Sequence, residues 1–281
     1  MFAVIKGAGD LASGIAIRLH HAGFNIAMTE IAAPLSVRRT VSFSQAVYEG
    51  RFLVEDVAAV LVKDEEGMRA AWHFPHAVRA GQIAVFVDPE AEIVKRLRPD
   101  VLIDAIMAKR NTGTSIKDAP IVIGIGPGFT AALDCCAVIE TQRGQTLGRV
   151  ITEGSALPNT GVPADIGGFS AERLLRCPED GIFEALSSIG DVVKQGDTVA
   201  LVRPAVPGSG EEDISPLGIG IPLRAGLSGM IRGLLPSGIR VREGMKAGDI
   251  DPRCERSHCF TVSDKALAIG GGALEAILRF K

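Results

Sequence analysis

The feature that most constrains this chain is a glycine-rich turn, Gly7–Ala12, set between an apolar run and a helix-forming stretch. Phe2–Lys6 is short and rich in strand formers, and Asp10–His21 carries apolar residues at helical spacing. A second strand-forming run, Asn25–Glu30, follows at once. Together these segments predict a βαβ unit at the start of the chain.

The turn reads G-x-G-x-x-A, a pattern that is typical of dinucleotide-binding sites. Gly7 permits a tight turn, Gly9 lets a pyrophosphate approach the backbone, and Ala12 lets the helix pack closely on the strand. Glu30 ends the next strand, where an acid accepts hydrogen bonds from ribose hydroxyls. The alternative is a turn that only packs a helix on a sheet, and the charge of Asp10 beside the expected phosphate favours that alternative.

Further strands and helices alternate along the first half of the chain, which predicts an α/β fold with a Rossmann-like doubly wound sheet over residues 1–152. The composition agrees: 47% of residues are hydrophobic but only 5% are aromatic, as suits strands buried on both faces. We expect strands at Ile83–Val87, Val101–Met107, Ile121–Ile125 and Ala137–Thr141, a hairpin or single strand at Phe52–Val62, and helices at Glu66–His73 and Pro89–Leu97.

The second half of the chain differs from the first in composition and contains an internal repeat. Residues 153–176 are rich in glycine and proline and indicate a linker or functional loop. An ungapped repeat follows, in which Gly181–Gly196 aligns with Gly229–Gly244. Each copy is expected to form a hairpin, so residues 177–253 predict a small all-β barrel-sandwich hybrid of the lipoyl and biotinyl kind. Residues 254–281 are expected to end in a helix that returns to the first domain.

Charge and targeting signals exclude several classes of protein. The net charge is −3 with no dense basic run, so neither nucleic acid nor a membrane is an expected partner. The chain runs directly into a strand without a signal peptide, and its five cysteines are irregularly spaced, which is typical of a cytoplasmic protein. The oligomeric state, including a homo-oligomer, is left open.

Polar residues that follow the predicted strands are candidates for ligand contacts, because the carboxyl ends of parallel strands form the ligand side of such a sheet. For residues 109–112 the alternative is a solvated loop, for Gly126 and Gly128 it is a plain turn, and for Arg38 it is a position at the surface. Weaker candidates end a later strand or lie in the glycine-rich stretch: Glu140, Thr141, Arg143, Asn159 and Thr160. The cofactor-binding candidates beyond the first turn are Arg38, Lys109, Arg110, Asn111, Thr112, Gly126 and Gly128.

Catalytic residues cannot be assigned from the sequence. It contains no nucleophile elbow, P-loop or carboxylate pair. Cys254 and Cys259, with His258 between them, are candidates for metal binding or for carrying sulfur or selenium, but no further Cys/His pair completes a zinc site. Cys135 and Cys136 lie in an apolar stretch that favours burial.

A set of motifs extends over nearly the whole chain, at residues 6–12, 28–30, 37–41, 46–50, 87–89, 104–114, 124–130, 138–141, 153–155, 158–161, 248–253 and 263–266. These motifs resemble those of the YqeB-type accessory proteins of selenium-dependent molybdenum hydroxylases. The resemblance implies a role in maturing a molybdenum hydroxylase, with a hydroxylase subunit as the partner, and supply or insertion of sulfur or selenium at its cofactor.

The leading hypothesis is therefore an accessory protein that binds a dinucleotide-type ligand, either a molybdopterin-type cofactor or NAD(P). Two alternatives stay open. One is an NAD(P)-dependent oxidoreductase, which needs a proton donor, although Tyr48 is the only tyrosine and has no lysine at helical spacing. The other is a non-catalytic protein-interaction scaffold. Whether the chain is an enzyme is not decided by its sequence.

Overall fold

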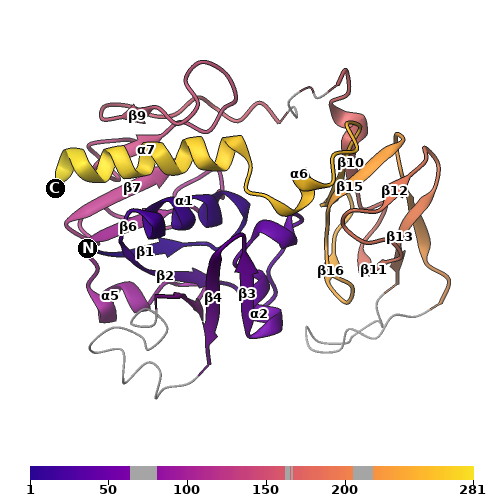
Figure 1. Cartoon of the computed structure of the whole chain (residues 1–281), viewed down its shortest axis with the longest axis horizontal. Helices are drawn as coiled ribbons and strands as arrows, with labels where there is room; N and C mark the ends of the chain where they lie inside the picture. Colours follow the sequence, from indigo (N-terminus) through magenta and orange to yellow (C-terminus); the bar gives the residue numbers. More distant parts are fainter. Residues whose placement is uncertain (64–80, 162–164, 166, 205–217) are drawn as a thin grey trace. The chain divides into compact units, whose positions relative to one another are not determined.

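The computed structural model describes residues 1–63, 81–161, 165, 167–204 and 218–281 (Figure 1). These residues form two compact units. Unit 1 contains Met1–Pro34, Val41–Thr160 and Val262–Lys281, and unit 2 contains Leu35–Thr40 and Gly161–Thr261. The helix expected at Glu66–His73 lies outside the described residues.

Unit 1 is built on a nine-stranded mixed sheet with the order β3-β4-β5-β2-β1-β6-β7-β8-β9. The seven strands from β4 to β8 in this order are parallel, whereas β3 and β9 pair antiparallel at the two edges. The strands are β1 (Phe2–Lys6), β2 (Asn25–Glu30), β3 (Arg51–Val54), β4 (Val57–Val62), β5 (Ile83–Val87), β6 (Val101–Asp104), β7 (Ile121–Ile125), β8 (Ala137–Ile139) and β9 (Val150–Ile151).

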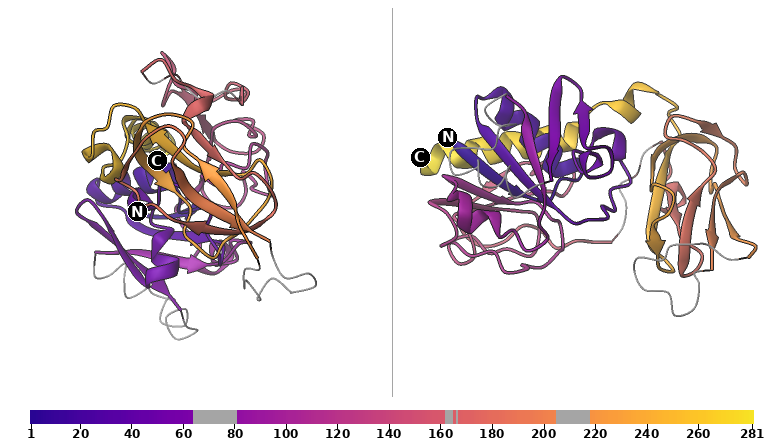
Figure 2. Two further views of the ribbon diagram at one scale, coloured as in Figure 1. Left: turned by 90° about the vertical axis from the view of Figure 1, so that its right-hand side faces the viewer. Right: turned by 90° about the horizontal axis from the view of Figure 1, so that it is seen from below.

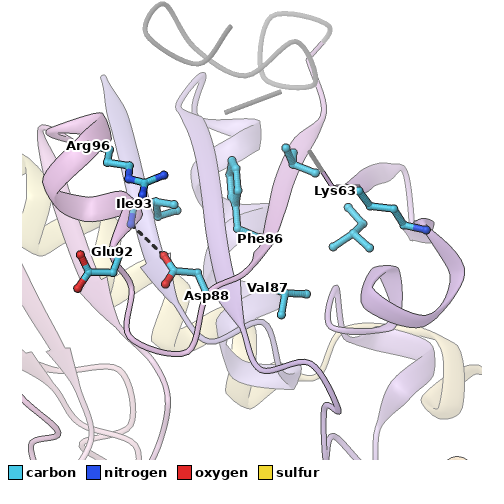
Figure 3. Close-up of a pocket in the computed structure, with 9 residues that line it drawn as sticks. Lys63, Phe86, Val87, Asp88, Glu92, Ile93 and Arg96 are labelled. Atoms are coloured by element: carbon cyan, nitrogen blue, oxygen red, sulfur yellow. Dashed lines mark hydrogen bonds between the residues drawn. The ribbon is translucent and has the colours of Figure 1, made fainter. Parts of the chain in front are cut away.

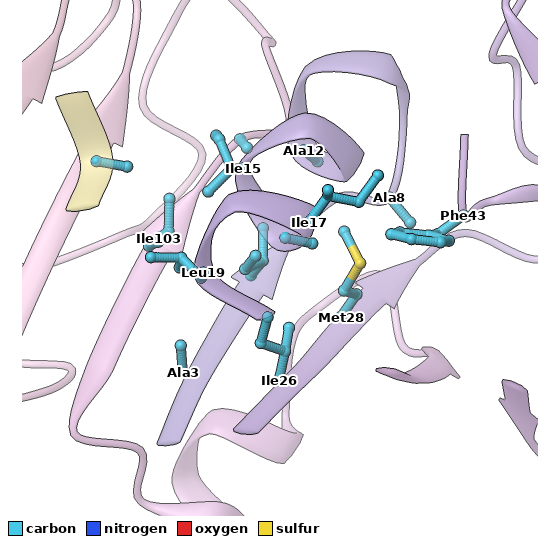
Figure 4. Packing of buried hydrophobic residues seen from close by; sticks show 14 of the residues in the cluster. Ala3, Ala8, Ala12, Ile15, Ile17, Leu19, Ile26, Met28, Phe43 and Ile103 are labelled. Carbon is cyan, nitrogen blue, oxygen red and sulfur yellow. The ribbon is translucent and has the colours of Figure 1, made fainter. Parts of the chain in front are cut away.

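Both faces of this sheet are buried, as its aliphatic composition predicts. Side chains alternate along a strand, so Ala3 and Ile5 of β1 pack on one face, beneath α1 (Asp10–His21) and α7 (Asp264–Phe280). Figure 4 shows this packing beneath α1. Phe2 and Val4 point to the other face, which is covered in part by α5 (Ile93–Leu97). Two short helices, η1 (Arg39–Val41) and α2 (Gln45–Glu49), follow β2 in the chain.

Helices α1 and α7 lie side by side over one face of the sheet and run in the same direction (Figure 1). A Cβ added to Gly14 of α1 would lie 2.6 Å from the Cβ of Ala266, and one added to Gly270 would lie 2.9 Å from the carbonyl oxygen of Gly14 and 3.0 Å from Cβ of Arg18. Successive turns of α1 thus meet successive turns of α7, and the two N-termini are at the same end of the sheet. No helix of the described residues is long and apolar enough to cross a membrane.

The expectation of a Rossmann-like doubly wound domain is wrong. The sheet is mixed, and the segments that join β6 to β7 (residues 105–120) and β7 to β8 (residues 126–136) contain no helix, although both are fully described. Glycine, proline and short polar residues in these segments favour turns over helix. Helix α7, from the far end of the chain, covers the sheet where crossover helices were expected.

Unit 2 consists of two four-stranded antiparallel sheets, with the orders β10-β17-β15-β12 and β14-β13-β11-β16. Phe183 and Val202 from one sheet and Ile231 and Ile250 from the other share one hydrophobic core, so the sheets pack face to face (Figure 2). A short 3-10 helix, η3 (Ala171–Arg173), precedes the sheets, and α6 (Ser257–Phe260) follows them. The strands are β10 (Leu174–Arg176), β11 (Gly181–Ala185), β12 (Val192–Val193), β13 (Thr198–Arg203), β14 (Ile221–Arg224), β15 (Gly229–Leu234), β16 (Arg240–Val241) and β17 (Lys246–Asp251).

The repeat does not form the expected pair of hairpins, so the prediction of a barrel-sandwich hybrid built from them is also corrected. Strands β11 and β12 of the first copy do not pair with each other; β11 pairs with β16, and β12 pairs with β15, both of the second copy. Strands β10, β13, β14 and β17, which lie outside the repeat, complete the two sheets. Each copy places one strand in each sheet, and in both sheets that strand pairs with a strand of the other copy.

Candidate functional site

Most of the sequence-predicted ligand residues of unit 1 lie where parallel strands end. We call this the carboxyl edge, and define it by the last residues of six strands. Because neighbouring strands are about 4.8 Å apart, loops that follow them are brought together whatever their separation in sequence. The defining residues are Lys6, Glu30, Val87, Asp104, Ile125 and Ile139.

The glycine turn after β1 has the conformation that its sequence predicts. Gly7 has a φ of 90°, which favours glycine, and its N–H donates to the carbonyl of Thr29 at 2.9 Å. Gly9 is the N-cap of α1 in an extended conformation and has no side chain with which to cap the helix. The first helical hydrogen bond runs from Ser13 N–H to the Gly9 carbonyl at 2.8 Å. The N-terminus of a twelve-residue helix therefore opens directly onto the turn.

Glu30 lies beside this turn, but its carboxylate is already engaged with the backbone. Oε2 accepts a hydrogen bond from the N–H of Ala8 at 3.0 Å, and Oε1 accepts one from Ile31 at 2.9 Å. Burial raises the pKa of Glu30, and these two hydrogen bonds oppose the rise. The acid thus joins the end of β2 to the glycine turn, whereas the sequence predicted contact with a ribose.

Lys265 is a site residue that sequence reasoning quoted only within a motif. It lies half-buried in the first turn of α7, and burial lowers its pKa, with Arg143 acting in the same direction. The carboxylates of Asp10, Glu140 and Asp264 oppose this shift, so Lys265 is close enough to interact with Asp10 at the start of α1. No local pattern could have shown this, since the two residues come from opposite ends of the chain.

The loop after β6 holds four predicted contacts. Lys109, Arg110 and Thr112 are exposed. Asn111 instead shapes the loop: its Nδ2 donates to the carbonyl of Thr114 at 2.7 Å, and its Oδ1 accepts from the N–H groups of Gly113 and Thr114 at 2.9 and 2.8 Å. The structure therefore gives Asn111 an internal role and leaves the three exposed side chains at the surface.

A buried polar triad fixes the base of this loop. Lys6 Nζ donates to Thr114 Oγ1 at 2.7 Å and lies 3.3 Å from Asp104 Oδ2, which in turn accepts from Thr114 Oγ1 at 2.6 Å. All three residues are at most 8% exposed. Sequence reasoning missed Lys6, because a lysine at a strand end usually reaches solvent.

The glycines after β7 let neighbouring loops pack together. Gly126 has a φ of 76°, and an added Cβ would lie 2.8 Å from Oγ1 of Thr141. Gly128 has a φ of 112°, and an added Cβ would lie 2.7 Å from the backbone of Arg110. Buried Glu140 accepts hydrogen bonds from three backbone N–H groups, two in the residues that follow it and one from Leu157. Gly126 and Gly128 thus serve close packing at the carboxyl edge.

Arg38 belongs to unit 2, whereas Glu30 belongs to unit 1. It is only 6% exposed, and its Nη2 donates to the carbonyls of His258 at 2.9 Å and Thr261 at 3.3 Å. Arg39 Nε donates to the Leu234 carbonyl at 2.8 Å. The two arginines hold the segment after β2 within the β unit.

The candidate sulfur carriers differ in environment. Cys254 is exposed, whereas Cys259 is buried and burial raises the pKa of its thiol. Nearby Asp251 is buried; burial raises its pKa, but hydrogen bonds from Arg253 at 2.6 to 3.1 Å outweigh this and hold the pKa at about 2. In the described part of the chain, no three His, Cys, Asp or Glu side chains are grouped so as to hold a metal ion.

A pocket of about 330 Å³ lies at the carboxyl ends of β4 and β5, beside α5 (Figure 3). Phe86, Ile93 and the ends of the two strands form its apolar part, and Lys63 and Arg96 lie on opposite sides of it in Figure 3. Asp88 accepts a hydrogen bond from the N–H of Ile93 at 2.9 Å. The sequence analysis singled out none of these residues as a ligand contact.

Comparisons with protein families and with solved structures give no strong similarity. No protein-family model matches the chain. An aspartoacylase family protein from Mesorhizobium loti MAFF303099 is 13% identical, with 89% of this chain and 83% of that chain covered and a TM-score of 0.27. A succinylglutamate desuccinylase/aspartoacylase from Rhodobacter sphaeroides is 14% identical, with 89% and 84% covered and a TM-score of 0.28. Both TM-scores are far below 0.5, so neither structure defines the fold of this chain.

A curated protein is much more similar to this chain in sequence than either of these solved structures. Over 276 residues the chain is 46% identical to a curated protein of Escherichia coli (strain K12) that bears the name "Uncharacterized protein YqeB". The aligned region is 98% of this chain but 47% of that protein, so the chain spans about half the length of its relative. Across nearly its whole length, therefore, this chain is similar to one half of YqeB.

Proposed function

We propose that this chain is an accessory protein in the maturation of a selenium-dependent molybdenum hydroxylase, and that it binds a dinucleotide-type ligand at the carboxyl edge of unit 1. The ligand would be a molybdopterin-type cofactor or NAD(P), with its phosphates at the Gly7–Gly9 turn. The observation that carries the proposal is the N-terminus of α1, which opens onto this turn beside Lys265. The motif resemblance supports the maturation role.

The electrostatics of this edge favour an anion. The N-terminus of a helix carries a partial positive charge of about half an elementary charge, and its first N–H groups have no acceptor within the helix, which suits them to phosphate oxygens. Helix α7 points its N-terminus to the same end of the sheet, although Ser263 accepts a hydrogen bond from its third residue, Ala266. Lys265 offsets the charge of Asp10, which was the main objection to a phosphate here.

Glu30 is compatible with this ligand. A carboxylate has about four acceptor positions, and the N–H groups of Ala8 and Ile31 occupy two of them. The remaining positions can accept hydrogen bonds from sugar hydroxyls. We further propose that a subunit of the client hydroxylase is the protein partner and that unit 2 provides its docking surface.

The proposal is tested by ligand retention. The protein is purified anaerobically from cells that make molybdenum cofactor and is measured by native mass spectrometry, as the unmodified chain and as Gly9→Asp. We expect a retained mass equal to a pterin dinucleotide or NAD(P) in the unmodified chain, and its loss in Gly9→Asp, because the new carboxylate repels phosphate. Activation of the client hydroxylase should be lost in parallel.

The matched control is Gly271→Asp. Gly271 lies in α7, and a Cβ added there meets no atom of the described residues within 4 Å, so the variant adds the same charge away from the turn. If Gly9→Asp and Gly271→Asp both retain the ligand, the site is not at the turn. A protein that stays bare when offered both ligand types, yet binds a hydroxylase subunit, would favour the interaction scaffold.

An NAD(P)-dependent oxidoreductase is less well supported by the described residues. Such an enzyme needs a proton donor at the carbonyl oxygen of its substrate, because hydride adds to the carbon and a proton to the oxygen. The hydroxyl of Tyr48, the only tyrosine, donates to the carbonyl of Pro34 at 2.8 Å. Turnover of NADH with a small carbonyl compound would favour this function over the accessory role.

A further inference from the structure

We infer that the pocket at the ends of β4 and β5 binds the planar heteroaromatic base of the ligand whose phosphates lie at the Gly7–Gly9 turn. This inference rests on the proposed function and adds the part of the ligand that the turn cannot recognise. A helix N-terminus binds phosphate irrespective of what the phosphate carries. Discrimination between ligands must therefore come from a second, shaped surface.

The size and lining of the pocket suit a base. Its volume, about 330 Å³, is at the lower end of the range of small-molecule sites. Phe86 and Ile93 form its buried floor, and the more accessible apolar surface comes from half-buried Leu61 and Val62 and exposed Val87. Apolar walls of this kind bind the faces of a planar ring, because they remove its apolar area from water.

The rim of the pocket offers hydrogen-bonding groups of both kinds. Lys63 and Arg96 provide donors, and Asp88 and Glu92 provide carboxylate acceptors (Figure 3). A purine, a pyrimidine or a pterin presents donors and acceptors side by side at its ring edge, and this rim can satisfy both.

The sheet order brings the strand ends beside the pocket and the turn close together, with Phe86 and Ile93 of the pocket on the α5 face of the sheet and α1 on the opposite face. Strands β1, β2 and β5 are consecutive neighbours, so the end of β5 lies two strand spacings, about 10 Å, from the end of β1. The Asp88 N–H donates to the carbonyl of Glu30 at 2.9 Å, which ties the pocket to the strand end beside the turn. A ligand with its diphosphate at the turn, its sugar at Glu30 and its base in the pocket would pass over the carboxyl edge from the α1 face to the α5 face.

The test compares nucleotides with their common phosphate part. ADP, CDP and inorganic pyrophosphate are titrated into the full chain by isothermal calorimetry, with the unmodified protein, Val87→Trp and Gly9→Asp. Val87 lines the pocket and is 44% exposed, so an indole there occupies space beside the pocket without entering the core. We expect at least one nucleotide to bind about tenfold or more tightly than pyrophosphate in the unmodified chain. Val87→Trp should remove that advantage and leave pyrophosphate binding unchanged.

Controls separate the two proposals. Val192→Trp makes the same substitution at an exposed strand position of unit 2 and should change neither affinity. Arg96→Gln, at an exposed rim position, provides a second variant and should lower only the nucleotide affinity, several-fold. If Val87→Trp and Arg96→Gln both leave the ratio of nucleotide to pyrophosphate affinity unchanged while Gly9→Asp abolishes binding, the base pocket is refuted and the phosphate site stands. If none of the three probes binds the unmodified chain, both proposals fail.

Discussion

The close approach of α1 to α7 can be tested with a single methyl group. Gly14→Ala would place a Cβ 2.6 Å from the Cβ of Ala266 and 3.0 Å from its carbonyl carbon. Carbon atoms pack favourably at about 3.5–4.0 Å, so the two helices must separate by about 1 Å. Overpacking of this kind costs about 1–3 kcal/mol. Alanine also has a higher helix propensity than glycine by about 1 kcal/mol, which offsets part of this cost, so we expect a net loss of up to about 2 kcal/mol.

Gly271→Ala is the matched comparison, because it makes the same change in α7 where an added Cβ meets no described atom within 4 Å. Only the propensity gain remains, so this variant should be stabilised by roughly 0.5–1 kcal/mol. The two substitutions should therefore shift stability in opposite directions, although propensity alone predicts the same sign for both.

The measurement is urea unfolding followed by circular dichroism at 222 nm, a signal that comes mainly from unit 1 because α1, α2, α5 and α7 belong to it. The midpoint should fall for Gly14→Ala and rise for Gly271→Ala at unchanged slope. In a double-mutant cycle, Ala266→Gly and Gly14→Ala should be coupled favourably by about 1 kcal/mol, which offsets the helix-propensity cost of the new glycine in α7. A midpoint that rises for Gly14→Ala would show that the helices do not pack as described.

Three further predictions concern charged groups. Lys6→Met leaves the Asp104 carboxylate buried without its cation and should destabilise unit 1 by about 3–5 kcal/mol, whereas Lys6→Met with Asp104→Leu should recover most of this loss in urea unfolding. Because the folded pKa of Asp251 is held at about 2, below the unfolded value of 3.8, its charged form stabilises the native state. The advantage over Asp251→Asn in calorimetry should be about 2 kcal/mol above pH 5 and should shrink as the pH falls from about 4 to 2; a pH-independent difference would contradict this. Lys265→Gln should weaken pyrophosphate binding about tenfold in calorimetric titration, and equal affinity would exclude the lysine from the site.

Several local elements are determined by the sequence alone. The first strand, the first helix and the second strand begin and end at the predicted residues, and so does β7. Each is specified by signals within a few residues: alternation or continuity of apolar side chains, helical spacing, and glycine at the turns. The conformation of the Gly7–Gly9 turn was predictable for the same reason, because its positive φ and open helix N-terminus depend on residues that are adjacent in the chain.

Only the tertiary structure decided which distant segments meet. Glycines weaken a helix, but those of α7 let other backbone pack closely: Gly270 meets Gly14, and Gly272 meets the carbonyl of Gly148. Lys265 faces Asp10 for the same reason. In unit 2 the repeat copies exchange strand partners, and Arg38 donates to a backbone carbonyl of that unit. These contacts form where two surfaces bury apolar area together and satisfy each other's buried polar groups. Every segment of the chain is a possible partner for every other, so a local sequence pattern does not specify which of them meet.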